Sequence, residues 1–140
     1  VVVQSMENFL PWTTTYGRAE ELMKKVGLHE DPHTLVKDIG VGKQQLVEIA
    51  KALAKDVKLL ILDEPTRGID IGTKTEIQKL VLDLADQGMA VTFISSEVEE
   101  MLRTCSRMAV LRDGQKVGEL EEDELSQSGV MKAIAGGDDK

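Results

Sequence analysis

The sequence predicts an α/β fold, because its hydrophobic pattern changes between two periods along the chain. Leu59–Leu62 and Ala90–Ile94 are short, continuous apolar runs, which are typical of parallel strands buried on both faces. Before, between and after these runs, apolar residues recur at helical spacing instead. The resulting order of helix, strand, helix and strand favours a mainly parallel sheet with helices packed against it.

The front of the chain predicts irregular backbone followed by helices. In chain order we expect an irregular segment, a helix, a polar loop and a second helix, over residues 1–15, 18–26, 29–38 and 43–55. Gly27 is suited to end the first of these helices, because glycine readily takes the left-handed conformation found after a helix.

Short motifs predict the boundaries of the later elements. Thr73-x-x-Glu76 is typical of a capping box at the start of a helix that ends near Gly88. Ser95-Ser96 can cap a short helix, and Asp113-Gly114 between two apolar runs is a strong hairpin signal. The acidic run over residues 119–124 is expected to be a solvated face, with a small helix over residues 130–135 after it.

Composition limits the classes of function. The 140 residues carry a net charge of −8, which argues against a nucleic-acid partner, since phosphate binding needs a basic surface. No apolar run approaches the length of a membrane span, so a membrane role would be peripheral. The single cysteine, Cys105, suits a reducing compartment and a structural role.

Asp63 and Glu64 directly follow the first predicted strand, where side chains of α/β proteins face the ligand-binding crevice. One carboxylate there can hold Mg²⁺, and its neighbour can orient or deprotonate an attacking water. The alternative is a solvated turn without chemistry, which would be favoured for the acidic pair alone.

The segment that opens the second predicted helix favours a chemical role for the acidic pair over a solvated turn. Gly40-Val41-Gly42-Lys43 opens this helix, and exposed backbone N–H groups at a helix N-terminus suit a phosphate. The segment is not a Walker A loop, because Lys37 and Gln44 stand where that motif requires glycine and serine or threonine.

The order of these motifs, followed by Arg67-Gly68-Ile69-Asp70 and by Phe93-Ile94-Ser95-Ser96-Glu97, strongly resembles the later part of an ABC-transporter ATPase domain of the bacterial sugar-importer type. The resemblance covers roughly residues 17–137. It implies a partial P-loop NTPase fold, in which a helical segment with the signature loop (residues 1–57) precedes the end of the ATPase core and a C-terminal hairpin (residues 58–140).

The resemblance also implies roles for individual residues. Gly40, Val41, Gly42 and Lys43 match the signature loop, which contacts the terminal phosphate of ATP held by the partner domain. Asp63 matches the magnesium ligand of Walker B, and Glu64 its catalytic carboxylate. Asp70 matches the D-loop at the dimer interface, and Ser96 stands where the family usually has the switch histidine.

Four departures from the family pattern qualify the expected activity. No Walker A motif is present, so we expect ATP affinity to be largely lost and the isolated chain to be inactive. Gly40 and Lys43 replace the serine and glutamine of the signature, and Ser96 cannot act as a histidine. The segment from Val41 to Leu53 resembles the first domain of a tandem importer ATPase, and the segment from Arg67 to Glu97 resembles the second.

The leading interpretation is an incomplete ATP-binding subunit of a sugar importer. It implies ATP and Mg²⁺ as cofactors, a second nucleotide-binding domain and membrane permease subunits as partners, and a place on the inner face of the bacterial inner membrane. The alternatives are a non-catalytic interaction module that binds a complete ATPase and, less favoured by the acidic charge, a piece of an ABC-like DNA-repair or chromosome protein.

Overall fold

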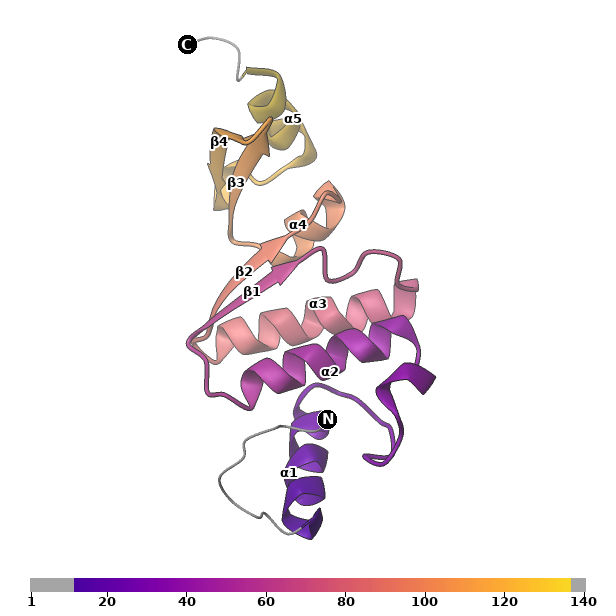
Figure 1. Cartoon of the computed structure of the whole chain (residues 1–140). Helices are drawn as coiled ribbons and strands as arrows, with labels where there is room; N and C mark the ends of the chain where they lie inside the picture. The colour runs from indigo at the N-terminus through magenta and orange to yellow at the C-terminus, as the bar shows by residue number, and fades with distance from the viewer. Residues whose placement is uncertain (1–11, 137–140) are drawn as a thin grey trace. The chain divides into compact units, whose positions relative to one another are not determined.

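The computed structural model describes residues 12–136, which divide into two compact units. The first holds the described residues up to Leu60 together with Pro65–Val91, and the second holds Ile61–Glu64 and the described residues from Thr92 onward. The elements, in chain order (Figure 1), are α1 (Trp12–Lys25), η1 (Val36–Asp38), α2 (Val41–Leu53), β1 (Leu59–Asp63), α3 (Ile71–Asp86), β2 (Ala90–Ile94), α4 (Val98–Thr104), β3 (Arg107–Arg112), β4 (Gln115–Glu121), η2 (Glu122–Glu124) and α5 (Gln127–Ala135).

The core of the first unit lies between α2 and α3, which run side by side (Figure 1). Leu46 and Ile49 of α2 are each 1% exposed, and Ile77 of α3 is fully buried. Ile77, Leu80, Val81 and Leu84 are all buried, so the predicted inner face of α3 is confirmed. Burial of such apolar faces is the main stabilising term in a domain of this size.

The first helix begins earlier than the sequence predicted. Residues 12–15 belong to α1, although they were expected to be irregular; the rest of that expectation, over residues 1–11, lies outside the described residues. No residue of α1 is buried, so its first turns have no apolar stripe that a pattern could reveal. The predicted end is confirmed: Gly27 has φ +71°, and the N–H of Leu28 returns to the carbonyl of Met23 at 2.9 Å.

Strands β1 and β2 form a two-stranded sheet. The N–H of Ala90 donates to the Lys58 carbonyl at 3.1 Å where the strands begin, and the N–H of Glu64 donates to the Ile94 carbonyl at 2.9 Å where they end. The strands are therefore parallel, as predicted. Burial on both faces was predicted wrongly: exposed and buried residues alternate along β1, because the described chain covers only one face of this strand.

The second unit is built on the hairpin of β3 and β4, which pair in antiparallel register. Asp113 and Gly114 both have positive φ angles, which a tight two-residue turn requires, so the hairpin prediction is confirmed. One face of the hairpin packs against α5, and the buried residues at this interface are Met108, Val110, Leu120 and Val130. A Cβ atom on Gly118 would stand 2.8 Å from that of Ala133, so glycine allows α5 to approach β4 closely.

The start of α3 differs from the predicted capping box. The N-cap is Asp70 rather than Thr73, and the Asp70 carboxylate accepts the Thr73 N–H at 3.0 Å. Aspartate is the stronger cap of the two, so the helix begins one turn earlier. Among the described residues, no helix is long and apolar enough to cross a bilayer.

Candidate functional site

The acidic pair lies where β1 ends, in the second unit. The Asp63 side chain is exposed and the Glu64 side chain is half-buried. Glu64 has φ +47°, a conformation that bulky side chains seldom adopt and that strains the backbone. Its carboxylate Oε1 accepts the N–H of Ser96 at 3.0 Å, while its own N–H bonds to Ile94. Two hydrogen bonds to the end of β2 therefore hold Glu64 in this strained position.

The glycine-led segment forms the N-terminus of α2, in the first unit. Gly40 is the N-cap residue, and a Cβ atom on it would meet nothing within 4 Å. Gly42 is buried, and a Cβ atom there would stand 2.4 Å from Thr73 Cγ2 and 2.9 Å from Ile69 Cγ2. The absence of a side chain therefore has a different effect at each glycine. Gly42 permits tight packing on the start of α3, whereas Gly40 leaves the helix N-terminus open.

Lys43 forms an ion pair with Glu30, a residue of the loop that follows α1. The hydrogen bond to Glu30 and its charge raise the pKa of Lys43, and the more distant Glu76 adds to the effect. As part of the signature-loop match, Lys43 was expected to contact phosphate. The ion pair with Glu30 is an arrangement that the pattern did not indicate, since nothing in a polar loop marks Glu30 as its partner.

Asp70 lies in the loop before α3 and is exposed. Hydrogen bonds from the backbone N–H of Thr73 and then from its hydroxyl group lower the pKa of the Asp70 carboxyl. Asp70 is thus a charged cap at the start of α3, next to the residues that Gly42 contacts.

Each unit brings a part of the predicted site together. In the first unit, Gly42 contacts the segment from Ile69 to Thr73, so the signature and D-loop matches are neighbours. In the second unit, Glu64 and Ser96 are joined by a hydrogen bond. No cluster of three metal-binding side chains occurs within residues 12–136. Asp63 is an exposed carboxylate, a type of ligand that Mg²⁺ commonly combines with water and phosphate oxygens.

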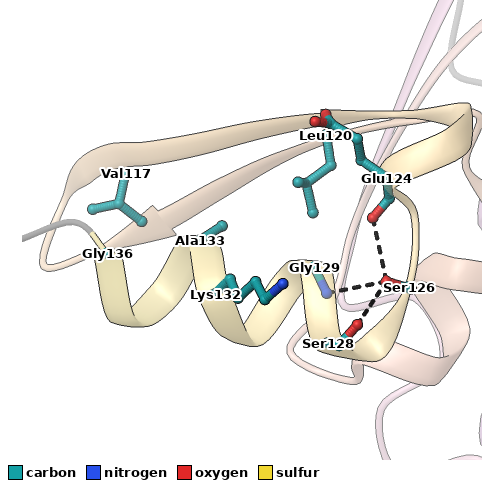
Figure 2. A pocket seen from close by; sticks show the side chains of 9 residues that line it. All are labelled: Val117, Leu120, Glu124, Ser126, Ser128, Gly129, Lys132, Ala133 and Gly136. Carbon is teal, nitrogen blue, oxygen red and sulfur yellow. Dashed lines mark hydrogen bonds between the residues drawn. The ribbon is translucent and has the colours of Figure 1, made fainter.

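A separate pocket lies between β4 and α5 of the second unit, with a volume of about 490 Å³ (Figure 2). Ser126 caps α5 at this pocket by accepting the N–H of Gly129 at 3.0 Å. A Cβ atom on Gly129 would stand 2.3 Å from the Glu124 carbonyl oxygen, so the turn requires glycine. None of the residues predicted from the sequence lines the pocket, and two of its polar groups, the Ser126 hydroxyl and the Gly129 N–H, are engaged in capping α5.

Comparison with known proteins connects this geometry to a family. The model of the family described as ABC transporter matches residues 2–67. An L-arabinose transport ATP-binding protein of Geobacillus stearothermophilus is 42% identical over 137 residues, which are 96% of this chain and 27% of the relative. A fructose import ATP-binding protein of Bifidobacterium longum is 50% identical over 118 residues, or 83% of this chain and 23% of the relative. The chain thus spans about a quarter of the length of these curated relatives.

Solved structures agree with the fold. A metal-chelate type ABC transporter in an inward-facing conformation matches with a TM-score of 0.77 at 24% identity, over 91% of this chain and 51% of that chain. A dimeric ATP-binding cassette in a post-hydrolysis state, bound to ADP and Pi, matches with a TM-score of 0.71 at 25% identity, over 83% of this chain and 50% of that chain.

The α/β fold and the order of motifs therefore identify the chain as a relative of the ABC-transporter ATPases, with the P-loop NTPase fold of their cassettes. The resemblance to ATPases of the sugar-importer type that the sequence indicated is confirmed, because sugar-import ATP-binding proteins are among its relatives at 41–50% identity. The roles of Gly40, Val41, Gly42, Lys43, Asp63, Glu64, Asp70 and Ser96 remain predictions.

Proposed function

We propose that this chain supplies the signature loop, Walker B acids and D-loop of the ATP-binding subunit of an ABC-type sugar import system. The observation that supports this most is identity of 42% to an L-arabinose transport ATP-binding protein over 96% of the chain, a stretch that includes all of these motifs.

The N-terminus of α2 is suited to contact the terminal phosphate of ATP bound to a partner domain. The first-turn N–H groups of a helix have no partner within the helix, and the helix dipole adds positive charge there. The open space at Gly40 leaves room for a phosphate to approach these groups. Lys43 would add positive charge from the same turn, once its ion pair with Glu30 rearranges.

The end of β1 is suited to the hydrolytic part of the reaction. Asp63 would hold Mg²⁺, which, when bound, neutralises charge on the phosphate oxygens. Glu64 would orient the attacking water and accept its proton. Ser96 carries no ring nitrogen, so it would contribute a hydroxyl and its backbone N–H, and we expect slow turnover at this site.

The phosphate-binding loop must come from elsewhere, because GxxxxGK[ST] does not occur in these 140 residues. We therefore propose that the chain alone neither binds ATP tightly nor hydrolyses it. In the assembled importer it would pair head-to-tail with a second nucleotide-binding domain and act on membrane permease subunits from the inner face of the bacterial membrane.

The test is ATP affinity, measured as anisotropy of a fluorescent ATP analogue. The probe is titrated with this chain, with a sugar-import cassette that carries an intact P-loop, and with both. We expect weak binding by the chain alone, and binding by the mixture about tenfold tighter than by the partner alone, or about 1.4 kcal/mol. Gly40→Val, which fills the approach to the α2 N-terminus, should abolish this gain.

Gly17→Val is the matched control, because a Cβ atom at Gly17 also meets nothing within 4 Å but lies in α1. A partner that associates without any gain in ATP affinity would favour the interaction module instead. Hydrolysis by the isolated chain that disappears in Glu64→Gln would contradict its proposed inactivity.

A further inference from the structure

Two adjacent acids of α4 have opposite environments. Glu99 is exposed, and its carboxylate lies 3.5 Å from the guanidinium group of Arg103, one turn along the helix. Glu100 is only 3% exposed, which is uncommon for a carboxyl group unless hydrogen bonds compensate for the lost water. A hydrogen bond to this carboxyl group comes from Ser95, whose hydroxyl group donates to Glu100 Oε2 at 3.1 Å.

The Ser95 hydroxyl group also accepts a hydrogen bond, from the backbone N–H of Glu97 at 3.0 Å. A serine hydroxyl has a single hydrogen, so donation to Glu100 directs its lone pairs toward the Glu97 N–H group. Glu97 is the N-cap residue of α4, so this pair of bonds fixes the turn between β2 and α4.

A second N–H group of the turn, that of Ser96, donates to Glu64 Oε1 at 3.0 Å. A hydrogen bond to an ionised carboxylate is shorter and stronger than one between neutral groups, and it depends on the direction of the donor. Glu64 itself has φ +47°, so its position is strained and needs support from the surrounding structure. All of these groups lie in the second unit.

We infer that Ser95 and Glu100 are positioning residues, which hold the Ser96 N–H group against the Glu64 carboxylate and so set the direction of that carboxylate. One consequence rests on the proposed function, namely that Glu64 then faces the attacking water in the direction that hydrolysis requires. The positioning itself is a property of this chain without nucleotide.

The Ser96 amide signal in ¹⁵N-labelled chain tests the inference. In Glu64→Gln the Ser96 N–H group loses its charged acceptor. The change in the Ser96 amide proton chemical shift in this variant therefore defines the effect of weakening that hydrogen bond. Ser95→Ala and Glu100→Ala should move the Ser96 proton signal in the same upfield direction and make its exchange with solvent about tenfold faster. Ser95→Thr keeps the hydroxyl group and Glu100→Gln keeps an acceptor oxygen, so both should retain most of the wild-type signal.

Glu99→Ala is the matched control and should leave the Ser96 amide unchanged, because Glu99 contacts Arg103 instead. Unchanged amide signals across the β3–β4 hairpin establish that the second unit is folded in each variant. A Ser96 amide that is unaffected by Ser95→Ala, or affected equally by Ser95→Thr, overturns the inference. If the Ser96 response occurs but the ATP titration shows no gain, the positioning stands and the proposed function fails.

Discussion

At the scale of the residue, the two glycines of the signature match are not equivalent. Gly42 is buried against Ile69 and Thr73, whereas Gly40 faces open space. We expect Gly42→Ala to reduce the free energy of unfolding by about 1–3 kcal/mol, because the added methyl group would displace the start of α3. Urea titration followed by circular dichroism measures this.

The matched substitution is Gly40→Ser. It places a Cβ atom in open space and introduces a favourable N-cap side chain, so stability should be equal or higher. Equal stabilities of Gly42→Ala and the wild-type chain would contradict the packing role assigned to Gly42.

At the scale of the element, Asp70 couples the stability of α3 to pH. Hydrogen bonds from Thr73 lower the pKa of Asp70 in the folded chain. A lowered pKa means that the ionised cap stabilises the fold above the ordinary carboxyl pKa. This contribution disappears as the pH falls below about 4 and through the folded value.

Thermal unfolding of the wild-type chain and Asp70→Asn between pH 7 and pH 2 measures this effect. Asparagine still accepts the Thr73 N–H but does not titrate, so the wild-type chain should be more stable at pH 7 and the difference should vanish at the acidic end. Asp38→Asn is the control, since Asp38 is also exposed but lies in η1. A difference that is constant with pH would contradict the role of the Asp70 charge.

The helices and strands differ in how well the sequence predicts them. The α3 face around Ile77 and the hairpin at Asp113-Gly114 were predicted, because both depend on local period and turn chemistry. The start of α1 was missed because its first turns bury nothing. Burial along β1 was predicted wrongly, because what covers a strand is a tertiary property that an apolar run does not encode.

Some residues of the candidate site were likewise predicted from the sequence and others were not. Asp63 and Glu64 were found from a local motif, and their position at the end of β1 followed from strand order. Glu30 and Glu100 were not found, and Ser95 was expected only as a helix cap, since their hydrogen bonds join side chains whose pairing has no fixed spacing in a sequence.

At the scale of the whole molecule, one face of β1 remains available to other chains. Leu59 is 53% exposed and Ile61 is 61% exposed, although both are apolar residues of a strand. Exposed apolar strands with free edges tend to pair with another chain, so we expect this chain to associate with itself as its concentration rises. The double substitution Leu59→Thr with Ile61→Thr should weaken that association while keeping strand propensity.

Sedimentation velocity over a hundredfold range of concentration measures the association. The double variant should remain at the monomer value where the wild-type chain shifts to larger species, and its urea midpoint should change little, because both side chains are already more than half exposed. Leu60→Thr is the contrasting substitution: Leu60 is 5% exposed, so the polar side chain should cost about 2–4 kcal/mol of stability and increase association through partial unfolding. Equal association of the wild-type chain and the double variant would show that self-association does not depend on this face of β1.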